Sequence, residues 1–143
     1  MAQKLSRIEA LVSAFAHLND WVHPTSRAFR NRNPLLLKAF SQKHERDEDG
    51  FRVFNSVPSG WDNSLMDLQI KCSGKSNANI KETSTLRDLV RFFGNDASAT
   101  RSVKNYLRHA LNDDSIRETQ ELKWFIEDNP KHQVAQSTEE INA

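Results

Sequence analysis

The residues best suited to bind a ligand lie in one short segment, Arg30-Asn31-Arg32-Asn33-Pro34. Arginine and asparagine side chains supply many hydrogen-bond donors and acceptors, and proline prevents the segment from continuing a helix. About twenty residues later the chain reads Gly50-Phe51-Arg52-Val53-Phe54-Asn55-Ser56 and then Gly60-Trp61, which is typical of a short strand, a turn and the start of a helix. Loop, strand, turn and helix in this order predict one wall of a cleft.

Two groups of basic side chains could bind phosphate. The first is a stripe on one face of a predicted helix, and the second is a cluster in the connection before Pro34: Arg101, Lys104 and Arg108, then Arg27, Arg30 and Arg32. Either group could contact phosphates of DNA or of teichoic acid. The net charge of the whole chain is only +1, and basic faces of this kind are usually just solvated. We therefore expect no nucleic-acid partner.

The sequence predicts no metal ion and no cofactor. His17, His23 and His44 do not have metal-ligand spacing with a cysteine or a carboxylate. Cys72 is the single cysteine, so it cannot form a disulfide within the chain. We expect it to be a buried thiol rather than a nucleophile.

Length and composition indicate one soluble domain. The chain has 143 residues, of which 37% are hydrophobic and 27% charged, as in ordinary globular proteins. No apolar run approaches the roughly 18 residues of a membrane span, and the N-terminus lacks the apolar stretch of a signal peptide. We expect synthesis in the cytoplasm, with the product kept or packaged there, and no membrane association.

The elements that must position these residues are mostly helices. Apolar residues at helical spacing predict a first helix from about Leu5 to Asp20. An irregular connection follows, then a short buried run at 35–40, a charged loop at 42–49 and a strand at 50–55. The turn Pro58-Ser59-Gly60 leads into a helix that reaches Cys72.

Three further helices are predicted after a polar loop at 73–82. A capping box from Thr85 to Asp88 opens the first, which ends at Gly94. Ser98 caps the second, and a capping box from Ser115 to Glu118 opens the third. We predict a mostly α-helical α+β domain over residues 1–130, with a small β element, and a mobile tail over 131–143.

The ordered set of motifs resembles the phage-associated, lysozyme-like domain family marked by an Arg-Asn-Asn-Asn-Pro-Gly-Asn-Leu loop. That family also has a Phe-x-x-Phe-x-Ser strand, helix starts at Gly-Trp and at Thr-Leu-Arg-Asp/Glu, and a helix with an inward Tyr. The matching residues here are Arg30, Asn31, Asn33, Pro34, Leu36 or Leu37, Phe51, Phe54, Ser56, Gly60, Trp61, Thr85, Leu86, Arg87, Asp88 and Tyr106. They lie between about Leu5 and Leu111. Arg32 replaces the middle Asn, Leu35 stands where the family has Gly, and the family's Glu-Asn-Asp-Thr stretch is not visible around 95–100.

The resemblance implies a lysozyme-like fold, related to goose-type lysozymes and lytic transglycosylases. Such domains have a Glu near the end of the first long helix, which protonates the glycosidic oxygen and needs a pKa raised by partial burial. Counted back from the Arg-Asn loop, this position is Asn19, whose amide has no proton to give. Asp20 follows, but one residue along a helix turns the side chain by about 100°. The other candidate acids, Glu45 and Glu48, lie in the charged loop.

The resemblance also implies that Asn31 and Asn33 hydrogen-bond sugar acetamido groups. The alternative is that they satisfy the backbone of their own loop, which we favour. Trp61 could stack on a sugar ring, but its place beside two Phe residues favours a core position. Together with Asn19, Arg30 and Tyr106, these residues are the candidate ligand-binding set.

The sequence therefore predicts a degenerate lysozyme-like domain of phage or prophage origin. We expect a non-catalytic virion component, or a module that binds peptidoglycan glycan or another protein. One alternative is an active muramidase or lytic transglycosylase that uses Asp20 or a loop carboxylate such as Glu48. Another is an inhibitory or regulatory module that binds a protein.

Overall fold

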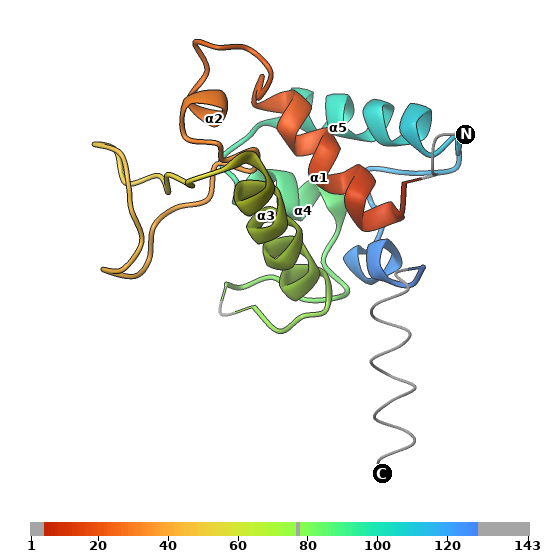
Figure 1. Ribbon diagram of the computed structural model, residues 1–143. Coiled ribbons are helices and arrows are strands. Elements are labelled where there is room, and N and C mark those ends of the chain that lie inside the picture. Colours follow the sequence, from red (N-terminus) through yellow and green to blue (C-terminus); the bar gives the residue numbers. More distant parts are fainter. Residues whose placement is uncertain (1–4, 77, 129–143) are drawn as a thin grey trace. The chain divides into compact units, whose positions relative to one another are not determined.

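The computed structural model describes residues 5–76 and 78–128. The described chain is mostly helical, which confirms the mostly α-helical character of the prediction (Figure 1). Its helices are α1 (Arg7–Leu18), α2 (Arg27–Arg30), α3 (Val57–Cys72), α4 (Leu86–Phe92), α5 (Ala97–Ala110) and the 3₁₀ helix η1 (Leu122–Ile126). The tail predicted over 131–143 lies outside the described residues.

The fold consists of two compact units. We call Met1–Leu11 with Gln69–Ala143 the α4–α5 unit, and Val12–Leu68 the α2 unit. The boundary between them falls inside α1 and inside α3, so each of these helices contributes residues to both units. The single domain predicted over residues 1–130 stays a prediction.

In the α4–α5 unit, α4 begins and ends as its sequence predicts. Thr85 and Asp88 form the capping box, with each side chain accepting a hydrogen bond from the backbone N–H of the other residue. Gly94 has a φ of +83°, and the amides of Gly94 and Asn95 bond to the carbonyls of Arg91 and Val90. This is a Schellman motif. The apolar face of α4 is buried, and α4 packs against α5.

The start of α5 differs from the prediction. Asp96, not Ser98, caps the helix, because its carboxylate accepts a hydrogen bond from the amide of Ala99 at 3.0 Å. Val103 and Leu107 are buried, as their spacing predicts. Tyr106, expected to face inward, is only partly buried.

The prediction of a last helix opened by Ser115 is wrong. The Ser115 hydroxyl bonds to Asp113 rather than to a helix amide, and the chain up to Glu121 stays non-helical. Its carbonyls at Glu118 and Gln120 accept hydrogen bonds from the amides of Arg87 and Leu86 at the start of α4. Because the backbone is paired with this neighbouring segment, only the shorter η1 forms afterwards.

In the α2 unit, the predicted strand at 50–55 does not form a ladder within the described residues. Phe51 and Arg52 make isolated antiparallel bridges with Lys38 and Arg46, respectively. The other backbone amides and carbonyls of this region form hydrogen bonds with turn residues and with asparagine side chains, and not with a neighbouring strand. The small β element of the prediction is thus reduced to these bridges.

Helix α3 begins three residues earlier than Gly60, at Val57. The hydroxyl of Ser56 accepts a hydrogen bond from the amide of Ser59 at 3.2 Å and caps the helix. Pro58 lies in the first turn, where its missing N–H costs nothing. The segment 58–60, predicted as a turn, is therefore the first turn of α3. A Cβ atom placed on Gly60 would lie 1.7 Å from the carbonyl oxygen of Arg32, so only glycine fits at this approach.

Candidate functional site

Asn19 follows α1 directly and is a structural residue. Its backbone amide bonds to the Phe15 carbonyl at 3.0 Å, which continues the helical pattern for one residue. Its side-chain Nδ2 donates to the Pro34 carbonyl oxygen at 3.0 Å. This bond joins the end of α1 to the Arg-Asn loop, and it requires a donor. An ionised carboxylate at this position could not make it, because a carboxylate only accepts hydrogen bonds.

Asp20, the first candidate for a substitute acid, ends the helix. It has a φ of +54°, and the amides of Asp20 and Trp21 bond to the carbonyls of His17 and Ala16. Asp20 therefore occupies the left-handed position of a Schellman motif, which Asp tolerates better than most residues. Its side chain is exposed. Glu48, the second candidate, is also exposed, in the turn between Asp47 and Gly50.

Asn33 is used entirely by its own loop. Its side chain is 0% exposed. Nδ2 donates to the carbonyls of Leu37 and Arg52, each at 3.0 Å, and Oδ1 accepts the amide of Leu37 at 2.9 Å. The interpretation that this side chain satisfies the loop backbone rather than a sugar therefore agrees with the structure.

Asn31 holds a second network in place. It is 7% exposed, and its Nδ2 donates to Asp47 Oδ2 at 2.8 Å. Asp47 also accepts the amides of Asp49 and Phe51 and pairs with Arg27. The hydrogen bond from Asn31, more than any other contact, holds the pKa of the Asp47 carboxyl below its usual value, and the backbone bonds and Arg27 act in the same direction.

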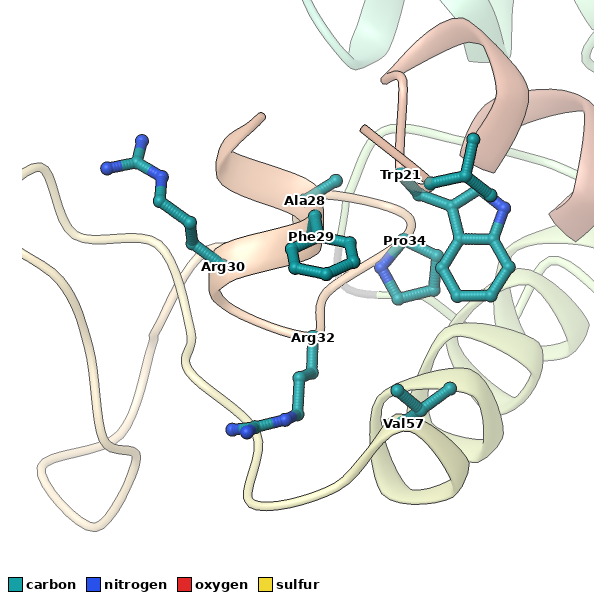
Figure 2. A pocket seen from close by; sticks show the side chains of 8 residues that line it. Trp21, Ala28, Phe29, Arg30, Arg32, Pro34 and Val57 are labelled. Atoms are coloured by element: carbon teal, nitrogen blue, oxygen red, sulfur yellow. The ribbon is translucent and has the colours of Figure 1, made fainter. Parts of the chain in front are cut away.

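The α2 unit contains a pocket of about 410 Å³ beside the Arg-Asn loop (Figure 2). Its size falls within the roughly 300–1,000 Å³ of ordinary ligand pockets. Mostly apolar side chains line it, together with two arginines: Trp21, Val22, Ala28, Phe29, Pro34, Val57, Arg30 and Arg32. Val22, Phe29 and Val57 are between 46% and 72% exposed, although they are large hydrophobic residues.

The two arginines of the pocket differ from Arg27, which is bound on both sides. Arg27 pairs with Asp47 and Asp49 and stacks on the Phe51 ring. Arg30 and Arg32 are exposed, and within the described residues neither forms an ion pair. They contact only the backbone carbonyls of Ser26 and Phe54, each at a long 3.4 Å.

Arg32 also has an unusual backbone. Its φ of +50° is the left-handed conformation at the end of α2, which costs a residue other than Gly, Asn or Asp about 1–2 kcal/mol. Glycine or asparagine would fit the position better. The backbone therefore does not explain why an arginine stands here.

Trp61 and Tyr106 belong to different units. Trp61 is half-buried, and its ring centroid lies 5.6 Å from that of Trp21, at an interplanar angle of 48°. Trp61 therefore supports the wall that Trp21 contributes to the pocket. Tyr106 belongs to the α4–α5 unit.

Two residues of the predicted basic stripe on α5 are engaged within their own unit. Lys104 pairs with Glu118 at 3.8 Å, and Arg108 Nε donates to the Ile116 carbonyl at 2.7 Å. Arg101 remains exposed. These contacts turn the stripe into a connection between α5 and the following segment.

Sequence reasoning missed the pocket, although a signal was present. Trp21, Val22 and Phe29 are apolar residues inside a connection that is otherwise polar and irregular, where no periodicity buries them. A search for helical or strand periodicity therefore overlooks such residues. Among the described residues, no group of three His, Cys, Asp or Glu side chains could hold a metal ion.

None of the helices in the described ranges combines the length and the apolar character that crossing a lipid bilayer requires. Comparisons of the chain with family models, with curated proteins and with solved structures found no match. The lysozyme-like fold and its associated function therefore stay predictions from the sequence motifs.

Proposed function

We propose that the protein is a non-catalytic, lysozyme-like domain of phage or prophage origin that acts by binding. It would be made in the cytoplasm and serve as a virion component or as a module that binds peptidoglycan glycan or another protein. The hydrogen bond from Asn19 Nδ2 to the Pro34 carbonyl carries this proposal. A general acid must hold and release a proton at this position, and an amide does neither at neutral pH.

The backbone of the Arg-Asn loop supports the link to the lysozyme-like family. When the loop is aligned through Pro34 and Leu37, two of the family's four asparagines fall at Arg32 and Leu36, which have φ values of +50° and +55°. Asparagine is one of the few residues that adopts this conformation readily. The loop thus has the backbone that the family sequence would favour, although the residues here are different.

The surroundings of the candidate acids favour binding over catalysis. A general acid is effective when partial burial raises its pKa, whereas both Asp20 and Glu48 are exposed. General acid catalysis contributes a factor of about 10²–10⁴ to the rate. A domain of this family without an enclosed acid would be nearly silent as a hydrolase.

A co-sedimentation assay with purified peptidoglycan sacculi tests the proposal. We expect the protein to be retained by intact sacculi, or to capture a protein of the assembled virion. Retention by sacculi favours the glycan-binding form, and capture of a virion protein favours the structural form. If neither purified sacculi nor purified virion proteins retain the protein, the proposal is overturned.

A further inference from the structure

The pocket of the α2 unit has a chemical character that differs from a sugar-binding cleft. Its polar side chains are those of Trp21, Arg30 and Arg32, and all three are hydrogen-bond donors only. A sugar hydroxyl both donates and accepts, so it binds best where carboxylate or amide oxygens are also present. The side chains of this pocket supply none. The lining instead favours a ligand that has hydrogen-bond acceptors and an apolar group.

The positive charge of the pocket lies to one side of an apolar centre. Figure 2 shows that the guanidinium groups of Arg30 and Arg32 extend away from Trp21, Pro34 and Val57, and that the Phe29 ring lies on the side of these apolar residues. Trp21, Pro34 and Val57 complete the apolar part. Guanidinium groups bind carboxylates with two parallel hydrogen bonds, which makes a carboxylate the best matched partner.

Arg32 gives a second, independent indication of a ligand. It keeps a long cationic side chain in a left-handed conformation that favours asparagine or glycine. The left-handed conformation itself is an ordinary helix end, because the amides of Arg32 and Asn33 bond to the carbonyls of Phe29 and Ala28. The identity of this side chain is explained if it contacts a ligand.

We infer that this pocket binds an acidic segment of a partner protein. One apolar side chain of the segment enters between Trp21, Phe29, Pro34 and Val57, and neighbouring carboxylates of the same segment pair with Arg30 and Arg32. The inference rests on the proposed function only in that the protein acts by binding. It adds the class of partner, which is a protein with an acidic segment. The partner segment therefore combines an apolar side chain with neighbouring carboxylates.

Three synthetic peptides test the inference by NMR titration of the full chain. The first is acetyl-Glu-Glu-Leu-Glu-Glu-amide, the second replaces each Glu by Gln, and the third replaces Leu by Gly. The reporter is the indole N–H signal of Trp21, assigned with Trp21→Phe. We expect the first peptide to bind with a Kd of about 1 mM or tighter, as a short fragment of a larger interface. We expect the other two to bind at least about tenfold more weakly.

Variants of the chain identify the site. Arg30→Gln and Arg32→Asn should each weaken the binding of the acidic peptide at least about fivefold, or by about 1 kcal/mol. Each should also reduce the dependence of this binding on salt. Arg32→Asn should fold at least as stably as the wild type, so a loss of binding cannot be attributed to unfolding. Arg101→Gln, which changes an exposed arginine of the other unit, is the matched control and should bind the peptide unchanged.

Two results would overturn the inference. One is that the Gln peptide binds as tightly as the Glu peptide, or that neither shifts the Trp21 signal. The other is that chitotetraose, a neutral glycan, shifts this signal while the acidic peptide does not. The second result would leave the proposed binding function intact. Conversely, release of muropeptides by the protein would remove the proposed function without affecting the peptide titration.

Discussion

The two units satisfy their backbone groups in different ways. In the α4–α5 unit, α4 and α5 each begin at a side-chain cap, and their carbonyls bond within the helices. In the α2 unit, residues 31 to 54 form no extended helix or ladder, and the side chains of Asn31, Asn33 and Asp47 bond to each other or to the backbone. The conformation of the loop in the α2 unit therefore depends on hydrogen bonds from individual side chains, whereas the helices of the α4–α5 unit depend on backbone hydrogen bonds.

The largest expected effect comes from Gly60, at the closest backbone approach in the α2 unit. In an exposed helix, Gly→Ala stabilises by about 1 kcal/mol. At Gly60 the new Cβ would lie 1.7 Å from the Arg32 carbonyl oxygen, so we expect Gly60→Ala to lower the free energy of unfolding by at least about 3 kcal/mol. Urea denaturation followed by circular dichroism measures this.

Gly50→Ala is the control for Gly60. Nothing lies within 4 Å of its new Cβ, and only its φ of +89° is unfavourable, so its cost should be about 1–2 kcal/mol. If Gly60→Ala stabilised the protein, this result would contradict the close approach of Gly60 in α3 to the Arg32 carbonyl in the Arg-Asn loop.

The next largest effect concerns Asn33. Asn33→Ala removes three hydrogen bonds and leaves the buried Leu37 N–H and the partly buried Arg52 carbonyl without their partners. We expect a loss of about 2–3 kcal/mol in the free energy of unfolding. Asn105→Ala, at an exposed position on α5, should change it by less than about 0.5 kcal/mol. Equal effects of the two substitutions would mean that Asn33 does not define the loop.

A smaller effect is expected where the α4–α5 unit depends on one side chain. Thr85→Ala removes one half of the capping box of α4, which should cost about 1 kcal/mol. Thr83→Ala, at an exposed position outside the capping box, is the control. Amide hydrogen exchange would show whether the loss is confined to α4. A cost above that of Asn33→Ala would reverse the comparison between the units.

These regions also differ in how far the sequence predicted them. The capping box of Thr85 and Asp88 and the Schellman glycine at Gly94 are local signals, so α4 could be predicted in full. The helix expected after Ser115 had an equally good local signal, but pairing with residues 82–87 prevents it. In the α2 unit, the structural role of Asn33 could be favoured from its residue type. The pocket and the contact at Gly60 could not be predicted, because they depend on tertiary approach.

The smallest effect is a change in acid stability at Asp47. Its pKa in the folded state is below the ordinary 3.8, so the unfolded chain takes up this proton first as the pH falls. Asp47 therefore stabilises the fold above about pH 4, and this contribution is lost as the pH falls through the lower folded pKa. Asp47→Asn should flatten the decline of stability in this range. Asp62→Asn, at an exposed position on α3, is the control for the change of residue type.

The most direct test of the central claim is release of soluble muropeptides from purified sacculi, measured by chromatography with a working lysozyme as reference. Because Asn19 donates an amide proton to the Pro34 carbonyl where an acid would be needed, we predict release no greater than in buffer alone. Release well above this level, abolished by Asp20→Ala or by Glu48→Ala, would contradict the account.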